Sequence, residues 1–268
     1  MIHVATVHFR SEKWIDVQLR YLHRNLSEPF RVVANLQGVP GDHASKYDRV
    51  IPARGGHPGK LNLMAAEIVN SAEPDDLIMF LDGDAFPVVD PMPLVRKALL
   101  ESSLVAVRRD ENYGDPQPHP CFAVVRVADW VRLRGDWTTG FVWQNSIGQE
   151  CTDTGGNMLA ILERQEERWT PLLRTNEVNI HPIWFAVYGG IVYHHGAGFR
   201  EPMARSTMSP QTTSVGSNGH RRILGSVARR AREFQAKRTD FKSSLENARL
   251  GEGVYERLMV DPEFYRTV

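Results

Sequence analysis

The chain has 268 residues, and its 32 Lys and Arg residues are balanced by 32 Asp and Glu residues, so its formal net charge is zero. Proteins that bind nucleic acid by bulk electrostatics carry a cationic excess, and this balance argues against such a partner. Hydrophobic residues make up 42% and charged residues 24%, a mix that is typical of a globular domain and excludes wholesale disorder. The sequence therefore predicts one large domain, alone or with a tail.

No stretch of the sequence is suited to cross a membrane or to direct secretion. The best candidate for a membrane span, residues 184–193, is too short and contains two glycines. The first residues lack a basic segment followed by an apolar stretch, so they predict a strand rather than a signal. The cysteines, Cys121 and Cys151, are too few for a disulfide framework. We therefore expect a cytoplasmic protein.

The first 130 residues alternate between strand and helix patterns. Runs of β-branched and apolar residues predict the strands, and amphipathic periodicity predicts the helices between them. The run at residues 77–81 is apolar throughout, which is typical of a central strand buried on both faces. The expected fold class is α/β, a single Rossmann-type domain with a mostly parallel central sheet. Strands are predicted at residues 2–9, 30–36, 49–52, 77–81, 104–108 and 121–127, and helices at 12–25, 61–71 and 94–101.

The second half of the chain is less regular. Asp153 is placed to cap a helix that runs to about residue 168, and residues 191–194 predict a late strand. Residues 205–219 are rich in Ser, Thr, Gly and Pro, as in a mobile loop or linker. Residues 221–238 are basic and helical in pattern, which indicates either a solvated helix or contact with an anionic partner such as a membrane surface. The expected domains are residues 1–204, a linker at 205–219 and a C-terminal helical extension at 220–268.

Two carboxylates follow the apolar strand at residues 77–81. Asp82 and Asp84 flank Gly83, and ligands of α/β sheets bind beyond the carboxyl ends of the strands. Two carboxylates with a glycine between them can hold a hard divalent cation that keeps positions open for phosphate oxygens. The simpler interpretation is an acidic turn at a strand end. A phosphatase loop of the haloacid-dehalogenase type is disfavoured because Phe86 stands where that loop typically has Thr or Val.

In the order of its motifs, the sequence resembles the GT-A-fold nucleotide-sugar glycosyltransferases. The matching segments are residues 5–9 with the helix that follows them, residues 59–62, residues 80–84 and residues 193–196. The resemblance covers about residues 1–200. It implies a GT-A-like domain and a metal-dependent enzyme that moves a sugar from a nucleoside-diphosphate sugar to an acceptor hydroxyl, with Mn²⁺ or Mg²⁺ as cofactor.

The resemblance also implies a set of metal ligands. Asp84 would be a direct ligand with a catalytic role, and Asp82 would contact the ribose or the metal. A histidine after a late strand often completes the metal shell in this family, which indicates His194 first and His195 second. The cation would neutralise charge on the leaving diphosphate without proton transfer, and an imidazole ligand favours Mn²⁺ over Mg²⁺. Adjacent histidines at a strand end can equally have structural roles.

Further residues are candidates for nucleotide binding. Lys60 follows a glycine just before a helix, where backbone N–H groups and an ammonium can both meet an anion. Thr6, His8 and Arg10 near the end of the first strand are candidates for the base and ribose pocket, with ordinary loop and cap roles as the alternative. Arg200 follows a glycine-rich turn and is a candidate to close onto the diphosphate, although it could equally pair with its neighbour Glu201.

A second site concerns the acceptor. Asp153 opens a helix beside Gly155 and Gly156, which let a ligand approach the backbone closely. In the family that the sequence resembles, a carboxylate at a comparable point often binds the acceptor hydroxyl or deprotonates it. Asp153 is therefore the candidate catalytic residue here, as well as a helix cap. Thr152 precedes it where the family more often has Glu, which leaves the role of inverting base open.

Two other functions are compatible with the same residues. A sugar-nucleotide pyranose/furanose mutase would use the same metal and diphosphate contacts, and the chain has no obvious acceptor-binding domain. A non-catalytic nucleotide-sugar-binding protein is less favoured because Asp82, Asp84 and His194 are all present. The sequence does not determine the base, the sugar, the acceptor or the anomeric outcome.

Overall fold

The computed structural model describes residues 1–52, 54–146, 148–196, 198 and 226–268, with side chains of residues 226–241 left out. Arg200, the expected linker at 205–219 and the side chains of the basic segment at 221–238 lie outside the described residues. Among the helices that are described, none combines the length and the apolar character that crossing a membrane requires.

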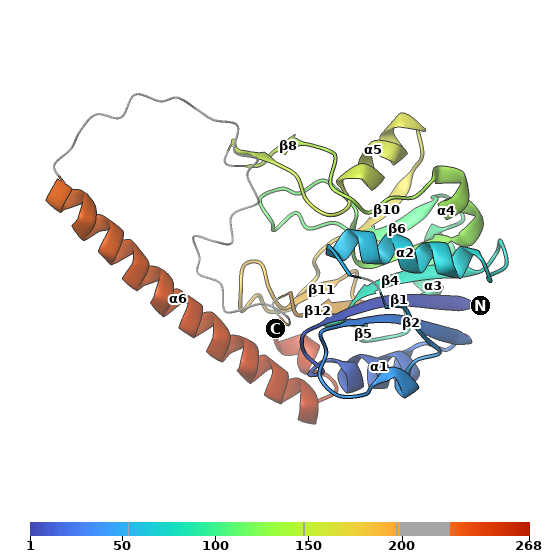
Figure 1. The fold of residues 1–268 in the computed structure, drawn as a ribbon, viewed down its shortest axis with the longest axis horizontal. Coiled ribbons are helices and arrows are strands. Elements are labelled where there is room, and N and C mark those ends of the chain that lie inside the picture. Colours follow the sequence, from blue (N-terminus) through green and yellow to red (C-terminus); the bar gives the residue numbers. More distant parts are fainter. Residues whose placement is uncertain (53, 147, 197, 199–225) are drawn as a thin grey trace.

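Within the described residues, seven strands form the central sheet: β1 (Ile2–Phe9), β2 (Phe30–Gln37), β3 (Arg49–Val50), β4 (Leu77–Asp82), β6 (Leu104–Val107), β7 (His119–Arg126) and β10 (Trp169–Leu172). Their order across the sheet is β10-β6-β7-β4-β1-β2-β3 (Figure 1). Only β7 runs antiparallel to its neighbours β4 and β6; the other pairings in this sheet are parallel. The expected α/β class with a mostly parallel sheet is confirmed.

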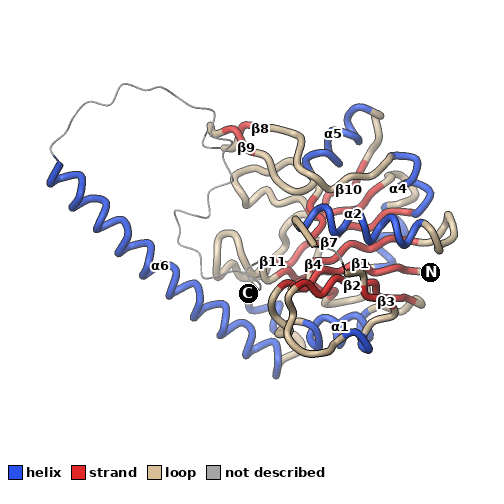
Figure 2. The backbone as a smooth tube through the Cα atoms, viewed as in Figure 1, coloured by secondary structure: helices blue, strands red, loops and turns tan. Residues whose placement is uncertain are grey.

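Both faces of this sheet are covered, which explains why the β4 sequence is apolar throughout. Leu77, Met79 and Leu81 point to one core cluster, whereas Ile78 and Phe80 point to the other, as the two-residue period of a strand requires. The first cluster is closed by α1 (Ile15–Asn25) and α3 (Met92–Ala98), and the second by α2 (His57–Val69), α4 (Val127–Leu133) and α5 (Gly156–Arg164) (Figure 2).

A small antiparallel sheet continues from the carboxyl end of β4. It contains β5 (Ala85–Pro87), β11 (Ala186–Tyr188) and β12 (Val192–His194), in the order β11-β12-β5. The short strands β8 (Trp143–Gln144) and β9 (Glu150–Cys151) form a separate hairpin, and a 3₁₀ turn, η1 (Ala44–Lys46), precedes β3. The β12–β5 register places His194 opposite Ala85, next to the Asp82–Asp84 turn.

The C-terminal helix α6 (Ser226–Val260) runs along one side of the molecule, with its first end extended away from the sheet (Figure 1). Its last turns and the 3₁₀ turn η3 (Phe264–Thr267) pack into a third core cluster. Val254, Leu258 and Phe264 meet Trp14 and aromatic residues of β5 and β12 in that cluster. The last turns of α6 and η3 are therefore part of the folded core.

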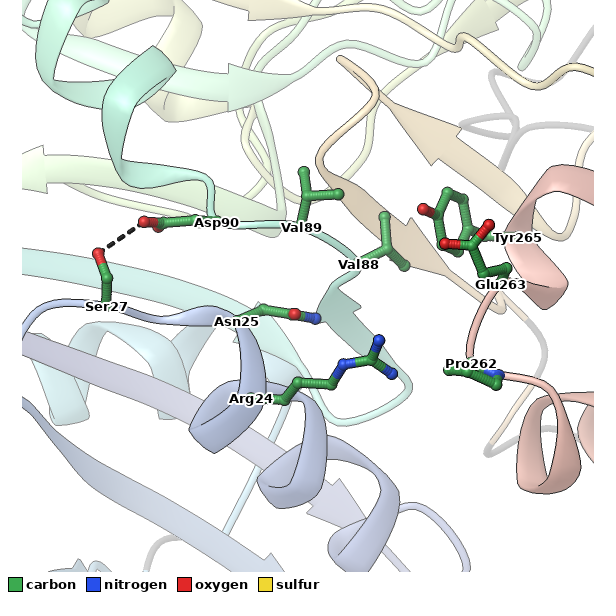
Figure 3. Close-up of a pocket in the computed structure, with 9 residues that line it drawn as sticks. All are labelled: Arg24, Asn25, Ser27, Val88, Val89, Asp90, Pro262, Glu263 and Tyr265. Carbon is green, nitrogen blue, oxygen red and sulfur yellow. Dashed lines mark hydrogen bonds between the residues drawn. The ribbon is translucent and has the colours of Figure 1, made fainter.

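A shallow pocket lies where η3 approaches the end of α1. Its volume is about 370 Å³, and its lining includes Arg24, Asp90, Glu263 and Tyr265 (Figure 3). Ser27 Oγ donates a hydrogen bond to Asp90 Oδ2 at 2.6 Å on its rim. None of the residues that the sequence indicated for metal, nucleotide or acceptor binding lines this pocket.

The structure corrects the expected helix after Asp153. α5 begins at Gly156, with Gly155 at the N-cap in a left-handed conformation (φ 101°) and no side-chain cap. Asp153 Oδ1 instead accepts a hydrogen bond from the adjacent Thr154 N at 2.7 Å, so the carboxylate is used before the helix starts. The helix ends at Arg164 rather than near residue 168, because Glu166 turns the chain with a φ of 54°.

The expected start of α2 is also corrected. The helix begins at His57 rather than at residue 61, so the last three residues of the Gly-Gly-His-Pro-Gly segment at 55–59 belong to its first turn. Pro58 is compatible with this start because the first turn of a helix has no partner for the missing N–H.

Candidate active site

In the part of the chain that the structure describes, Asp82, Asp84 and His194 form a group in which one ligand atom from each lies within 4.8 Å of the others. His194 Nε2 is 3.5 Å from Asp84 Oδ1 and 3.6 Å from Asp82 Oδ2. Asp84 and His194 are buried, and Asp82 is half-buried. Two carboxylates and an imidazole at this spacing fit a divalent cation such as Mn²⁺.

The charges of this group compensate one another. Burial raises the pKa of Asp82, but His57 and His194 outweigh it and leave that pKa below its usual range. Burial also raises the pKa of Asp84, but His194 outweighs this effect and leaves the pKa lowered. Burial lowers the pKa of His194, but Cys121 and Asp84 raise it well above its ordinary value. The imidazolium therefore balances the carboxylates, and a cation that binds here must displace its proton.

His57 is a member of the site that the sequence analysis did not select. Its Nε2 lies 2.9 Å from Asp82 Oδ1, which leaves Oδ2 on the side of His194. The available signal was the Gly-Gly-His-Pro-Gly loop at residues 55–59, but nothing local to that loop indicates which carboxylate it meets. The contact depends on the packing of α2 beside β4.

Lys60 follows one turn after His57 on α2 and is almost fully buried, with 4% exposure. Its Nζ lies 5.0 Å from the centre of the Phe9 ring, and burial lowers its pKa. Among the described residues no carboxylate forms an ion pair with this ammonium group. A buried cation of this kind is costly unless an anion compensates it, so Lys60 is suited to a phosphate ligand.

The three candidates on β1 and just beyond it have different surroundings. Thr6 is fully buried beneath the Asp82 turn: its Oγ1 donates to Gln18 Oε1 at 2.9 Å, and Gln18 Nε2 donates to the Asp82 carbonyl at 2.7 Å. His8 is also fully buried, and burial lowers its pKa to about 4. Arg10 is exposed, with its guanidinium 4.7 Å from the centre of the Phe9 ring. Thr6 thus supports the turn, whereas Arg10 is open to a ligand.

His195 lies apart from the carboxylates. Its Nδ1 is 2.9 Å from the Tyr193 hydroxyl, and its ring lies 4.5 Å from that of Trp14 and 4.8 Å from that of Phe185. Burial lowers its pKa to about 3. Of the two adjacent histidines, His194 is therefore the one whose ring joins Asp82 and Asp84.

A second polar cluster lies near the amino end of β7, next to the group of Asp82, Asp84 and His194. The His119 ring lies 6.3 Å from the His194 ring, and its Nε2 is 3.4 Å from Arg109 Nη1. Burial lowers the pKa of Arg109, but Tyr188, Cys121 and Asp153 outweigh it and raise that pKa. Arg109 lies in an irregular segment and His119 at the start of a strand, and neither was selected from the sequence.

Asp153 belongs to this second cluster through its charge. Burial raises the pKa of Asp115 to about 7, and the charge of the half-buried Asp153 contributes to that rise. The neighbouring glycines serve the fold: a Cβ on Gly155 would lie 2.1 Å from the Pro118 carbonyl oxygen, and one on Gly156 would lie 2.8 Å from Phe141 N. The close approach expected of a ligand at these glycines is made by the protein's own backbone.

Comparisons with known proteins find matches to this chain among solved structures. No protein-family model matches the sequence, and no curated protein matches it. Among solved structures, the mannosyltransferase PcManGT from Pyrobaculum calidifontis, in complex with GDP-Man and Mn²⁺, matches 63% of this chain and 54% of its own length, with 12% identity and a TM-score of 0.44. The glycosyltransferase GlyE of Streptococcus pneumoniae TIGR4 matches 63% of this chain and 44% of its own length, with 13% identity and a TM-score of 0.39. TarS of S. aureus matches 51% of this chain and 30% of its own length, with 15% identity and a TM-score of 0.39.

These three structures are similar to between half and two thirds of this chain. The chain spans from under a third to just over half the length of these three structures.

Proposed function

We propose that the protein is a metal-dependent glycosyltransferase that takes the sugar of a nucleoside-diphosphate sugar and transfers it to an acceptor hydroxyl. The observation that carries this proposal is the group of Asp82, Asp84 and His194 beyond the carboxyl end of β4. Sheets of this kind bind ligands at that edge. When bound there, Mn²⁺ or Mg²⁺ would act as a Lewis acid for the leaving diphosphate.

The first turn of α2 supports diphosphate binding beside the cation. His57 contacts Asp82 at 2.9 Å, and Lys60 lies three residues further on, so both side chains extend from one face of the helix. The ammonium of Lys60 supplies positive charge for phosphate oxygens, and the backbone N–H groups of His57 and Gly59 lie in the same first turn. Arg10 is exposed at the end of β1 and is available to the nucleoside.

The cluster of His119, Arg109 and Asp153 is our candidate for the acceptor side. Asp153 would bind the acceptor hydroxyl or take its proton as the sugar is transferred. Arg109 is half-buried, and its buried Nε makes no hydrogen bond among the described residues, so this donor would be satisfied by a ligand that enters the cluster. The Asp153 carboxylate and the Arg109 guanidinium together suit a neutral, hydroxyl-rich ligand.

Calorimetry with Mn²⁺ and a series of UDP-, GDP- and dTDP-sugars tests the proposal. We expect nucleotide binding to require the cation, and Asp84→Asn to weaken both affinities about tenfold or more, because the diphosphate charge is then left uncompensated. Asp129→Asn, on α4, is the matched control and should change neither. Equal nucleotide affinity in Mn²⁺ and in EDTA would contradict a metal bridge.

A further inference from the structure

The two oxygens of the Asp84 carboxylate have different environments. Oδ1 faces His194 at 3.5 Å, whereas Oδ2 accepts a hydrogen bond from the backbone N–H of Gly198 at 2.9 Å. A Cβ on Gly198 would lie 2.6 Å from Asp84 Cβ and 2.4 Å from Trp14 Nε1. Only a glycine therefore fits between Asp84 and the indole without displacing one of them.

Trp14 holds Gly198 from the opposite side. Its Nε1 donates a hydrogen bond to the Gly198 carbonyl at 3.2 Å. The indole is 1% exposed and packs 4.5 Å from the ring of His195. His195 in turn donates its backbone N–H to the Asp84 carbonyl at 3.0 Å. The indole thus lies between two residues that both contact Asp84.

Helix α6 holds Trp14 in this place. The Tyr255 ring makes an edge contact with the indole at 5.1 Å, and its hydroxyl donates to the Lys13 carbonyl at 3.1 Å. Lys13 Nζ pairs with Glu252 Oε2 at 2.6 Å and lies 3.9 Å from the centre of the Tyr255 ring. The residue before Trp14 and the indole itself are therefore both fixed by one turn of α6.

We propose that Trp14 is a positioning residue for the metal centre. By holding Gly198 against Asp84 Oδ2, it fixes the carboxylate with Oδ1 toward His194, where the cation would bind. Partners that orient a ligating carboxylate in this way affect metal affinity although they do not touch the metal. The inference rests on the proposed function, since it concerns the cation of that site, and it makes α6 part of the catalytic unit.

The test compares two tryptophan-to-phenylalanine variants. Trp14→Phe keeps an aromatic ring but removes the donor to Gly198. Trp137→Phe makes the same change at a fully buried indole whose Nε1 has no hydrogen-bond partner among the described residues. We expect the Mn²⁺ dissociation constant, measured by calorimetry and electron paramagnetic resonance, to rise about two- to tenfold in Trp14→Phe, the equivalent of one hydrogen bond, and to stay unchanged in Trp137→Phe.

Gly198→Ala is the second variant, in case Trp14→Phe does not fold. Its Cβ displaces Gly198 from both partners and should weaken Mn²⁺ binding by a similar factor, whereas Gly253→Ala, where a Cβ meets nothing within 4 Å, should not. Unchanged Mn²⁺ affinity in folded Trp14→Phe or in Gly198→Ala would overturn the inference.

A wild-type protein that binds no Mn²⁺ would contradict the proposed function rather than this contact. The ¹⁵N imidazole signals of His194 in metal-free protein would then test whether Trp14 positions the Asp84 carboxylate. They should shift in Trp14→Phe and Gly198→Ala if Asp84 is reoriented, and identical signals in all variants would show that Trp14 does not position the carboxylate.

Discussion

Asp82 divides its carboxylate between two histidines from distant parts of the chain. His57 of α2 meets Oδ1 and His194 of β12 lies nearest Oδ2, and both lower the pKa of the acid against the effect of burial. Because each histidine occupies a different oxygen, His57 can stay in place while a cation binds on the side of His194. The same division recurs at Asp84, between His194 and the Gly198 amide.

Buried histidines elsewhere make the folded state sensitive to acid. His181 Nδ1 accepts hydrogen bonds from Ile183 N at 3.2 Å and Trp184 N at 2.9 Å, so a proton at that atom would break both. Burial, helped by the charge of Arg174, lowers the pKa of His181 from 6.5 to about 4. Between these two values the unfolded chain binds the proton first, so the free energy of unfolding falls as the pH falls.

We therefore predict that the contribution of His181 is fully present above pH 6.5 and is lost as the pH falls to about 4. His181→Asn keeps an acceptor for the two amides but does not titrate, so its unfolding free energy should fall less steeply over this range. Urea denaturation at a series of pH values measures both slopes. Equal slopes in the two proteins would mean that folding does not lower the pKa of His181.

At the scale of elements, the last turns of α6 contribute buried residues to the third core cluster. Leu258 is 1% exposed and packs with Val254 and Phe264 against residues of α1, β5 and β12. Leu245 lies on the same helix but is 42% exposed. Among the described side chains of α6, from residue 242 onward, the buried ones are Val254 and Leu258.

This difference in exposure predicts that the same substitution, leucine to alanine, has different effects on stability at positions 258 and 245. Leu258→Ala should lower the free energy of unfolding by about 2–5 kcal/mol, because it removes buried methyl groups and leaves a cavity. Leu245→Ala should change it by less than about 0.5 kcal/mol, as surface substitutions do. Denaturant unfolding with both variants is the measurement, and a Leu258→Ala cost no larger than that of Leu245→Ala would show that the end of α6 is not docked in solution.

At the scale of the whole molecule, two polar regions border the group of Asp82, Asp84 and His194. His57 and Lys60 on α2 form the first, and His119 and Arg109, near the start of β7, form the second. A nucleotide in the first region and an acceptor in the second would meet at the cation. A mutase would need only the first region, because it returns the same sugar to the same diphosphate.

Incubation with a nucleotide sugar and Mn²⁺, but without acceptor, separates these functions. We predict at most slow hydrolysis to free sugar and nucleoside diphosphate, because water can take the acceptor's place beside Asp153. Nuclear magnetic resonance of the sugar nucleotide follows the reaction. Reversible formation of an isomeric sugar nucleotide with its diphosphate intact would identify a mutase, and the same assay on Asp153→Asn would then measure the role of that carboxylate.

Local patterns in the sequence determined the parts of the site that come from one segment. The apolar run of β4 and the acidic turn after it are neighbours in sequence, so the strand, its burial on both faces and the paired carboxylates were predictable. The parallel sheet followed from the alternation of strands and helices. The late strand with its two histidines was likewise visible, but not which histidine faces the carboxylates.

Tertiary structure decided every contact between distant segments. The β12–β5 register places His194, the last residue of β12, beside the carboxylates, whereas the ring of His195, just beyond the strand, packs on Trp14 and Phe185. The packing of α2 beside β4 brings His57 to Asp82, and the docking of α6 fixes Trp14 against Gly198. Such contacts depend on the pairing of strands and helices far apart in the chain, and no spacing within a single segment encodes them.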